Sequence, residues 1–315
     1  MTGALRSLGA ASAPEAQFES VRALLDLPET RIDLSKAKLT IDRMIDPRID
    51  VAATLVQLDT MASQIRATLP AGASSRARVE AIRSFLYEGK RPFQYDLQDP
   101  LGGNIQNKLL PTHLATRKGN CVSMPFLFIV LGQRLGLDLT ASTAPEHVFV
   151  KFRDETGTWF NLETTSGAGF TSDGWIQKNM PMSAQALANG IYMQPLTKKQ
   201  TVGVMLGTLM EWYGQQAQHE ARMGVANLVL AHDPKDVSAI LHISSAYYGM
   251  KRREFESKYA RPGDVPLPLR PRLLELDQNI HLWRAKAEAL GWREPEQGEQ
   301  QQVVNTGGSV KGAGQ

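Results

Sequence analysis

The chain contains one cysteine, Cys121, which stands in the segment TRKGNCVSMPFL at positions 116–127. A thiol is a useful nucleophile when it is deprotonated, and a helix N-terminus or a nearby imidazole can lower its pKa from about 8.5 by several units. Gly119 and Asn120 precede the cysteine, and an almost wholly apolar run follows it. This pattern indicates either a nucleophile at a helix start or a small core residue, and the choice depends on a partner imidazole.

Of the six histidines, His147 is the one that opens a predicted strand, HVFVKFR at positions 147–153. A strand-borne histidine that faces a cysteine at a helix start is the layout of a Cys-His-acid triad. A second predicted strand, TWFNLET at 158–164, offers the third member, because Asn161 and Glu163 are two residues apart and share one face. We therefore expect His147 to activate Cys121 and either Glu163, which we prefer, or Asn161 to orient the imidazole.

The tetrahedral intermediate of such a reaction needs hydrogen-bond donors for its oxyanion. The backbone N–H of Cys121 at the helix start is the natural donor, and the side chain of Asn120 is a second candidate. These two residues complete the expected site.

The elements that must position these side chains follow from local patterns. Residues 121–135 predict a helix buried on nearly all sides, which Gly136 ends. Pro125 is tolerated there only near the start, because the first four N–H groups of a helix lack intrahelical partners. Pro125 therefore places Cys121 at the helix N-terminus. The strands at 147–153 and 158–164 are expected to form a hairpin around the turn at 154–157.

The flanking regions are mostly helical. Apolar spacing predicts helices across much of 18–92, and a second helical zone runs from about 199 to 292. In that zone Tyr213 and Tyr247 lie 34 residues apart, the period of tetratricopeptide repeats, and Pro234 fits the same spacing. Arg222 stands where that repeat has a small residue, so ordinary antiparallel helices are the alternative.

The composition is that of an ordinary globular protein, with 42% hydrophobic and 21% charged residues and a net charge of +3. Basic residues form no long run, which argues against a nucleic-acid partner. The longest apolar segment, 122–131, is far shorter than the roughly 20 residues that span a bilayer. We therefore expect no membrane partner and a cytoplasmic location, or a periplasmic one if a leader was removed. The sequence has no pair of His or Cys residues at metal-ligand spacing and no Gly-rich phosphate-binding loop after a strand. We therefore expect neither a metal nor a cofactor.

The order Cys121, His147 and an acid four places after Trp159 resembles the transglutaminase-like superfamily, relatives of papain-type cysteine proteases. That family has an Asp in the pattern W-x-x-x-D-x-T, where this chain has Glu163 followed by Thr165. The segments IRSFLY and FQY are also similar to those that precede the cysteine in bacterial members. The resemblance covers roughly residues 40–170. When the C-terminal helices are included, the chain is similar to a bacterial subfamily that joins such a core to tetratricopeptide repeats.

The resemblance implies an α+β fold, in which helices packed on a small antiparallel sheet form the core and an all-α tetratricopeptide-like region follows. The expected division has four parts. They are a flexible tail at 1–17, a transglutaminase-like domain at 18–195, a repeat-like region at 199–292 and a disordered tail at 293–315.

The implied function is that of a cysteine hydrolase or acyltransferase of protease, amidase or deamidase type. It would attack a peptide or protein amide and form a thioester. Members of the repeat-bearing subfamily often lack the cysteine. The alternative is therefore an inactive scaffold that binds a protein partner on its helices. A regulator whose thiol senses oxidants is a third reading.

Overall fold

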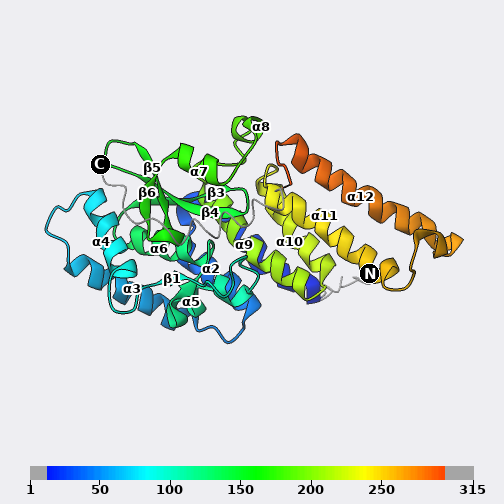
Figure 1. Ribbon diagram of the computed structural model, residues 1–315. Helices are drawn as coiled ribbons and strands as arrows, with labels where there is room; N and C mark the ends of the chain where they lie inside the picture. The colour runs from blue at the N-terminus through cyan, green and yellow to red at the C-terminus, as the bar shows by residue number, and fades with distance from the viewer. Residues whose placement is uncertain (1–12, 295–315) are drawn as a thin grey trace, which may run out of the picture.

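The computed structural model describes residues 13–294, and it has the expected α+β architecture (Figure 1). A four-stranded antiparallel sheet is formed, in spatial order, by β3 (Asp138–Ala144), β4 (His147–Arg153), β5 (Trp159–Glu163) and β6 (Gly169–Thr171). The hairpin of β4 and β5 confirms the predicted pair of strands, whereas β3 and β6 had not been predicted. A second, parallel pair joins β1 (Gln94–Tyr95) to β2 (Lys118–Gly119).

Most helices that come before the sheet in the chain lie beneath it in Figure 1. They are α2 (Leu34–Ile45), α3 (Val51–Ala67), α4 (Ser75–Tyr87), α5 (Leu110–Thr116) and α6 (Ser123–Arg134). Helix α1 (Ala13–Asp26) instead packs mainly on α10 (His219–His232) of the C-terminal region, and it also contacts α2 and α9 (Lys198–Gln215). Helix α1 begins at Ala13, so residues 13–17 are helical and the expected tail was wrong there. The rest of that tail, residues 1–12, and residues 295–315 of the C-terminal tail lie outside the described residues.

Six helices follow the last strands. They are α7 (Asp173–Asn179), α8 (Ala184–Ala188), α9 (Lys198–Gln215), α10 (His219–His232), α11 (Val237–Lys251) and α12 (Arg270–Ala289). Helices α9 to α12 pack on one another in sequence and extend away from the sheet (Figure 1). Helix α9 also contacts α2 and β3, so it belongs to the core and to the helical region together. Whether α9–α12 are tetratricopeptide repeats stays a prediction.

Helix α6 is the centre of the core. Every residue from Ser123 to Gly132 is buried, and the helix contacts α3, α4 and α5 as well as β3 and β4. Gly132 allows the close approach of β3, because a Cβ there would lie 2.0 Å from Cδ1 of Leu139. Pro125 is the third residue of the helix, where its missing N–H needs no acceptor. The helix begins two residues after Cys121, rather than at Cys121 as predicted.

A buried ion pair ties α2 to the segment before the thiol. Lys38 and Asp42 form a salt bridge, and both side chains are fully buried. Lys38 also donates to the carbonyl of Lys108 at 2.8 Å, and Asp42 accepts from the backbone N–H of Leu110 at 2.8 Å. The two charges therefore fix the entry into α5. Within the described residues, no helix combines the length and apolar character needed to cross a membrane.

We expect Lys38→Met to lower the free energy of unfolding by about 3–5 kcal/mol, because the change leaves the Asp42 carboxylate buried without its cation. Urea denaturation followed by circular dichroism measures the effect. Arg48→Met is the matched control, since Arg48 pairs with Asp46 on the surface and its loss should leave stability essentially unchanged. Equal stability of the Lys38 and Arg48 variants would contradict this role of the pair.

Candidate active site

Cys121 lies half-buried in the turn that leads into α6. The turn is shaped by Asn120, whose side-chain oxygen accepts from the backbone N–H groups of Val122 at 3.0 Å and Ser123 at 3.4 Å. This cap satisfies two of the donors that a helix start leaves open. The backbone N–H of Cys121 makes no hydrogen bond in the described part of the chain, so it is available to a ligand.

The turn is anchored to the rest of the core through Ser123. Its hydroxyl accepts from the N–H of Asn120 at 3.2 Å and donates to the carbonyl of Asn107 at 2.6 Å. Asn107 directly precedes Lys108, whose carbonyl accepts from the buried Lys38. A continuous set of hydrogen bonds therefore connects the position of the thiol to the ion pair of α2.

The register of the hairpin brings His147 and Glu163 together. Lys151 lies opposite Asn161 and Val150 opposite Leu162, so Glu163 is the next residue along β5 towards the start of β4. Diagonal neighbours on one face of an antiparallel pair are within reach of long side chains. His147 Nε2 and Glu163 Oε2 are 2.7 Å apart, and both side chains are buried, with 2% and 5% exposure.

Asn161, the alternative third residue, is held elsewhere by the same register. It accepts from Lys151 Nζ at 2.8 Å and donates to Asp173 Oδ1 at 2.6 Å. It lies two residues further along β5, opposite Lys151 rather than beside His147. The structure therefore brings Glu163, and not Asn161, into contact with the imidazole.

Glu163 is in turn fixed by the residue that the family pattern also contains. Its second oxygen, Oε1, accepts from the backbone N–H of Thr165 at 3.0 Å and from the Thr165 hydroxyl at 2.6 Å. Burial alone would raise the pKa of Glu163. The charge of His147 and these hydrogen bonds outweigh burial and lower it. Glu163 is thus a carboxylate in the neutral pH range.

The imidazole of His147 carries the opposite shift. Burial opposes its charged form, but the charge of Glu163 and the nearby Cys121 side chain overcome burial and raise the pKa of His147. Because Glu163 occupies Nε2, Nδ1 is the ring nitrogen left for the thiol, and it is buried without a hydrogen-bond partner among the described residues. The imidazole is thus bonded to Glu163, and Cys121 is near enough for its charge to act on the ring.

Two neighbours of the thiol were not singled out from the sequence as site residues. The Cys121 sulfur lies 3.9 Å from the carbonyl oxygen of Glu146, a residue held in the left-handed region at φ 54°. Tyr95 is close enough that the charge of Cys121, added to burial, raises the pKa of its phenol. Tyr95 is the last residue of the FQY segment, so the signal for it was present in that motif.

The comparison with protein families matches the model of the transglutaminase-like superfamily to residues 52–207. The chain belongs, through these residues, to the transglutaminase-like superfamily. A comparison with curated proteins and one with solved structures each found no match. The match contains Cys121, His147 and Glu163, and it ends inside α9.

A cleft of about 580 Å³ adjoins the site of this transglutaminase-like domain. Val122, Glu146 and His147, which surround the thiol in sequence or space, line it on one side. Its other walls come from the segment 189–196 and from helices α9, α10 and α11. The C-terminal helical region therefore forms part of the cleft beside the candidate triad.

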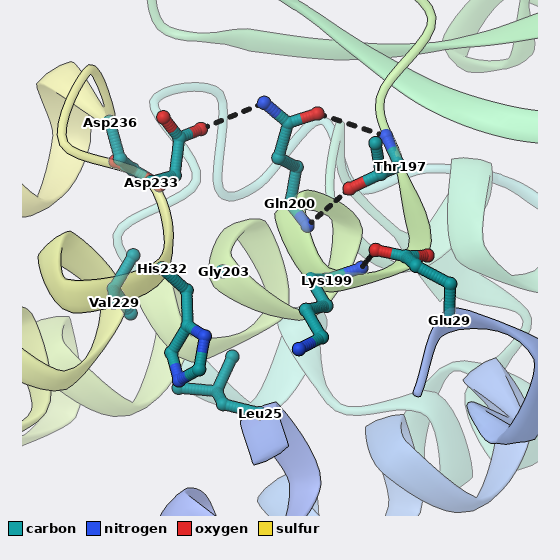
Figure 2. Close-up of a pocket in the computed structure, with 10 residues that line it drawn as sticks. All are labelled: Leu25, Glu29, Thr197, Lys199, Gln200, Gly203, Val229, His232, Asp233 and Asp236. Carbon is teal, nitrogen blue, oxygen red and sulfur yellow. Dashed lines mark hydrogen bonds between the residues drawn. The ribbon is translucent and has the colours of Figure 1, made fainter. Parts of the chain in front are cut away.

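A smaller hollow of about 200 Å³ lies beside the start of α9 (Figure 2). Its polar side chains bond to one another. Gln200 donates to Asp233 at 2.9 Å and accepts from the N–H of Thr197 at 3.0 Å, while Glu29 accepts from the N–H of Lys199 at 3.1 Å. His147 lines the larger cleft but not this hollow, and Cys121 lines neither of the two. The candidate triad therefore adjoins the larger cleft through His147.

We expect the imidazole of His147 to titrate at a lower pH in Glu163→Gln than in the unmodified protein. Without the carboxylate, burial is opposed only by Cys121, and burial disfavours the imidazolium. The ¹⁵N shifts of the ring, followed by NMR against pH, measure the change. Asn161→Ala is the matched control, because Asn161 bonds to Lys151 and Asp173 and should leave the titration unchanged. Equal effects of the two variants would refute the distinction between these residues.

Proposed function

We propose that the protein is a cysteine hydrolase or acyltransferase that acts on a peptide or protein amide through a thioester on Cys121. The observation that supports this most is the buried hydrogen bond of Glu163 to His147, with Cys121 near the imidazole and His147 lining a large cleft. The cysteine and histidine have the type and order of the superfamily pattern, and Glu163 is an acid in place of its Asp. The roles assigned below to single residues are part of the proposal.

In the first step the thiolate of Cys121 attacks the amide carbon and a carbon–sulfur bond forms. His147, which holds the thiol proton as an imidazolium, donates it from Nδ1 to the departing nitrogen as the carbon–nitrogen bond breaks. Glu163 keeps the imidazole in orientation from Nε2 and stabilises its positive charge. The products are a free amine and an acyl-enzyme thioester.

The oxyanion of the intermediate is assigned to the backbone N–H of Cys121, which donates to no other group among the described residues. Loss of one such donor in other enzymes costs about 3 kcal/mol of transition-state stabilisation. Asn120 is the weaker candidate. Its side-chain oxygen already caps α6, while its amide nitrogen is buried without a partner in the described residues.

In the second step an acceptor resolves the thioester. His147 takes a proton from the acceptor as it attacks the carbonyl, and the thiolate leaves. Water as the acceptor gives hydrolysis of a peptide bond or a side-chain amide, and an amine gives transamidation. A partner or substrate protein on the helices α9–α12 is part of the same proposal, because these helices line the cleft.

The alternative is a scaffold in which the same cleft binds a partner without chemistry. One observation favours this scaffold. Of the candidate triad only His147 lines the cleft, so most of the cleft surface could bind a partner without taking part in a reaction. The two functions differ in one measurable property, the reactivity of the thiol.

We expect native Cys121 to react with iodoacetamide at pH 6, and His147→Ala to slow this reaction about tenfold or more, because the imidazolium no longer stabilises the thiolate. Mass spectrometry gives the rate without ambiguity, since the chain has one cysteine. His232→Ala, which removes an exposed histidine on α10, is the matched control and should react as the unmodified protein does. A thiol that reacts only after denaturation would exclude the enzymatic proposal.

The reaction itself is tested with a pool of peptides in water enriched in ¹⁸O, with and without monodansylcadaverine. We expect the unmodified protein to place ¹⁸O into cleaved or deamidated peptides, or to attach the amine to them, and Cys121→Ala to do neither. The relative yield of the two products identifies the acceptor. Identical product patterns for both proteins would favour the scaffold.

A further inference from the structure

A group of polar side chains lines the cleft away from the candidate triad, where α9, α10 and α11 meet. Arg222 of α10 bonds to His242 of α11 and lies near Glu211 of α9, which pairs with Lys108. Thr208 of α9 lines the same cleft. Neither the proposed acyl transfer nor the packing of the helices requires a guanidinium at this place. Arg222 is also the residue that departs from the tetratricopeptide pattern, where a small side chain is expected.

The guanidinium of Arg222 is held in a defined position. Its Nε donates to Nδ1 of His242 at 2.8 Å. It packs over Gly214 of α9, where a Cβ would lie 2.9 Å from Nη1, so a larger residue there would displace it. The remaining N–H groups of Arg222 make no hydrogen bond within the described part of the chain. A half-buried arginine fixed by one nitrogen keeps its fork free for a ligand.

The charges around Arg222 do not neutralise its positive charge. Lys108 and Glu211 form a salt bridge with each other, so their charges cancel. Burial and the positive charges of Arg222 and Lys108 hold the pKa of His242 well below its usual value, so this histidine is neutral. One positive charge therefore remains among the four groups, and it is that of Arg222.

An independent observation comes from Thr208, which also lines the cleft. Its side chain is 2% exposed, yet its hydroxyl has no hydrogen-bond partner in the described residues. A buried hydroxyl without a partner destabilises the fold, and one that lines a cleft can be satisfied by a bound ligand. Thr208 lies one helical turn before Glu211 and faces the same cleft.

The group is also connected to the thiol. Lys108 follows Asn107, whose carbonyl accepts from the hydroxyl of Ser123, two residues after Cys121. Arg222 also lines the same cleft as His147 and Val122, so a ligand that bonds to Arg222 can extend along that cleft towards Cys121.

We propose that Arg222 and Thr208 form a subsite for a carboxylate of the substrate, so that the enzyme selects peptide substrates with an acidic group at a set distance from the scissile amide. This inference rests on the proposed function, because it assigns the substrate class of the same cleft. An arginine fork matches a carboxylate with two parallel charge-assisted hydrogen bonds, and the threonine hydroxyl supplies a third donor.

The test uses N-iodoacetyl derivatives of glycine, β-alanine, γ-aminobutyrate and longer ω-amino acids, each compared with its own methylamide. In every reagent the thiolate displaces iodide and a sulfur–carbon bond forms. The rate of each reagent with Cys121 is divided by the rate of the same reagent with free glutathione. This ratio removes the effect of the reagent's charge on its intrinsic reactivity. We expect one spacer length at which the acid labels Cys121 about tenfold faster than the amide.

Variants assign this preference to the subsite. Arg222→Met should abolish it, Thr208→Val should reduce it severalfold, and Lys235→Met, which removes another cation that lines the cleft, should leave it unchanged. Thr208→Val keeps the side-chain shape, so it tests the subsite even if Arg222→Met does not fold. The rate with plain iodoacetamide should be the same in all three variants.

The outcomes separate the subsite from the proposed function. Equal normalised rates for acids and amides at every spacer length would overturn the subsite. Independence of the plain iodoacetamide rate from His147 would overturn only the proposed function, because the ratio of acid to amide does not depend on thiol activation. Titration of glutarate against the NMR signal of Arg222 Nε–H gives a second measurement without alkylation, in which no saturable shift would also overturn the subsite.

Discussion

The hydrogen bond between Nε2 of His147 and the carboxylate of Glu163 is the contact on which the candidate site depends. Both groups are buried, so each would be neutral or poorly oriented alone. Together they keep the imidazole charged and hold one ring nitrogen, which leaves the other for the thiol. Glu163 is one methylene longer than the Asp of the superfamily pattern. Its second oxygen is fixed by the backbone and hydroxyl of Thr165, which removes the freedom that a longer side chain would have.

The thiol of Cys121 and the imidazole of His147 come from different parts of the core, and α6 packs between these parts. His147 is placed by the register of the β4–β5 hairpin, which is local in sequence. Cys121 is placed by hydrogen bonds that run through Ser123 and Asn107 to the ion pair of Lys38 on α2. The thiol therefore depends on contacts between residues far apart in the chain. The site requires the intact N-terminal helices as well as the sheet, although its reactive groups come from only two short segments.

The parts of this site that local patterns determine could be predicted from the sequence. The hairpin that carries His147 follows from two strand-like segments around the turn at 154–157. The buried helix after Cys121 follows from its apolar run and from the position of Pro125. The choice between Glu163 and Asn161 could not be made, because both share a face and only the pairing with Lys151 separates them. Strands β3 and β6 have weak patterns, and the cleft is formed by α9–α11 packing beside the domain, which is tertiary information. The proposed role of Arg222 as a carboxylate subsite could not be predicted from the sequence either, because it depends on the same packing of helices.

The cost of the buried charges bears on the choice between enzyme and scaffold. Taking an imidazolium and a carboxylate out of water costs several kcal/mol for each ion, and their attraction often does no more than offset this. Apolar residues of similar size at His147 and Glu163 would serve a scaffold at least as well, because the adjoining strands already form a continuous core. The same reasoning applies to Thr208, whose unpartnered hydroxyl gives packing no advantage over valine. His147 and Thr208 line one cleft, and Glu163 bonds to His147, so these costly groups are best explained by what the cleft binds or transforms.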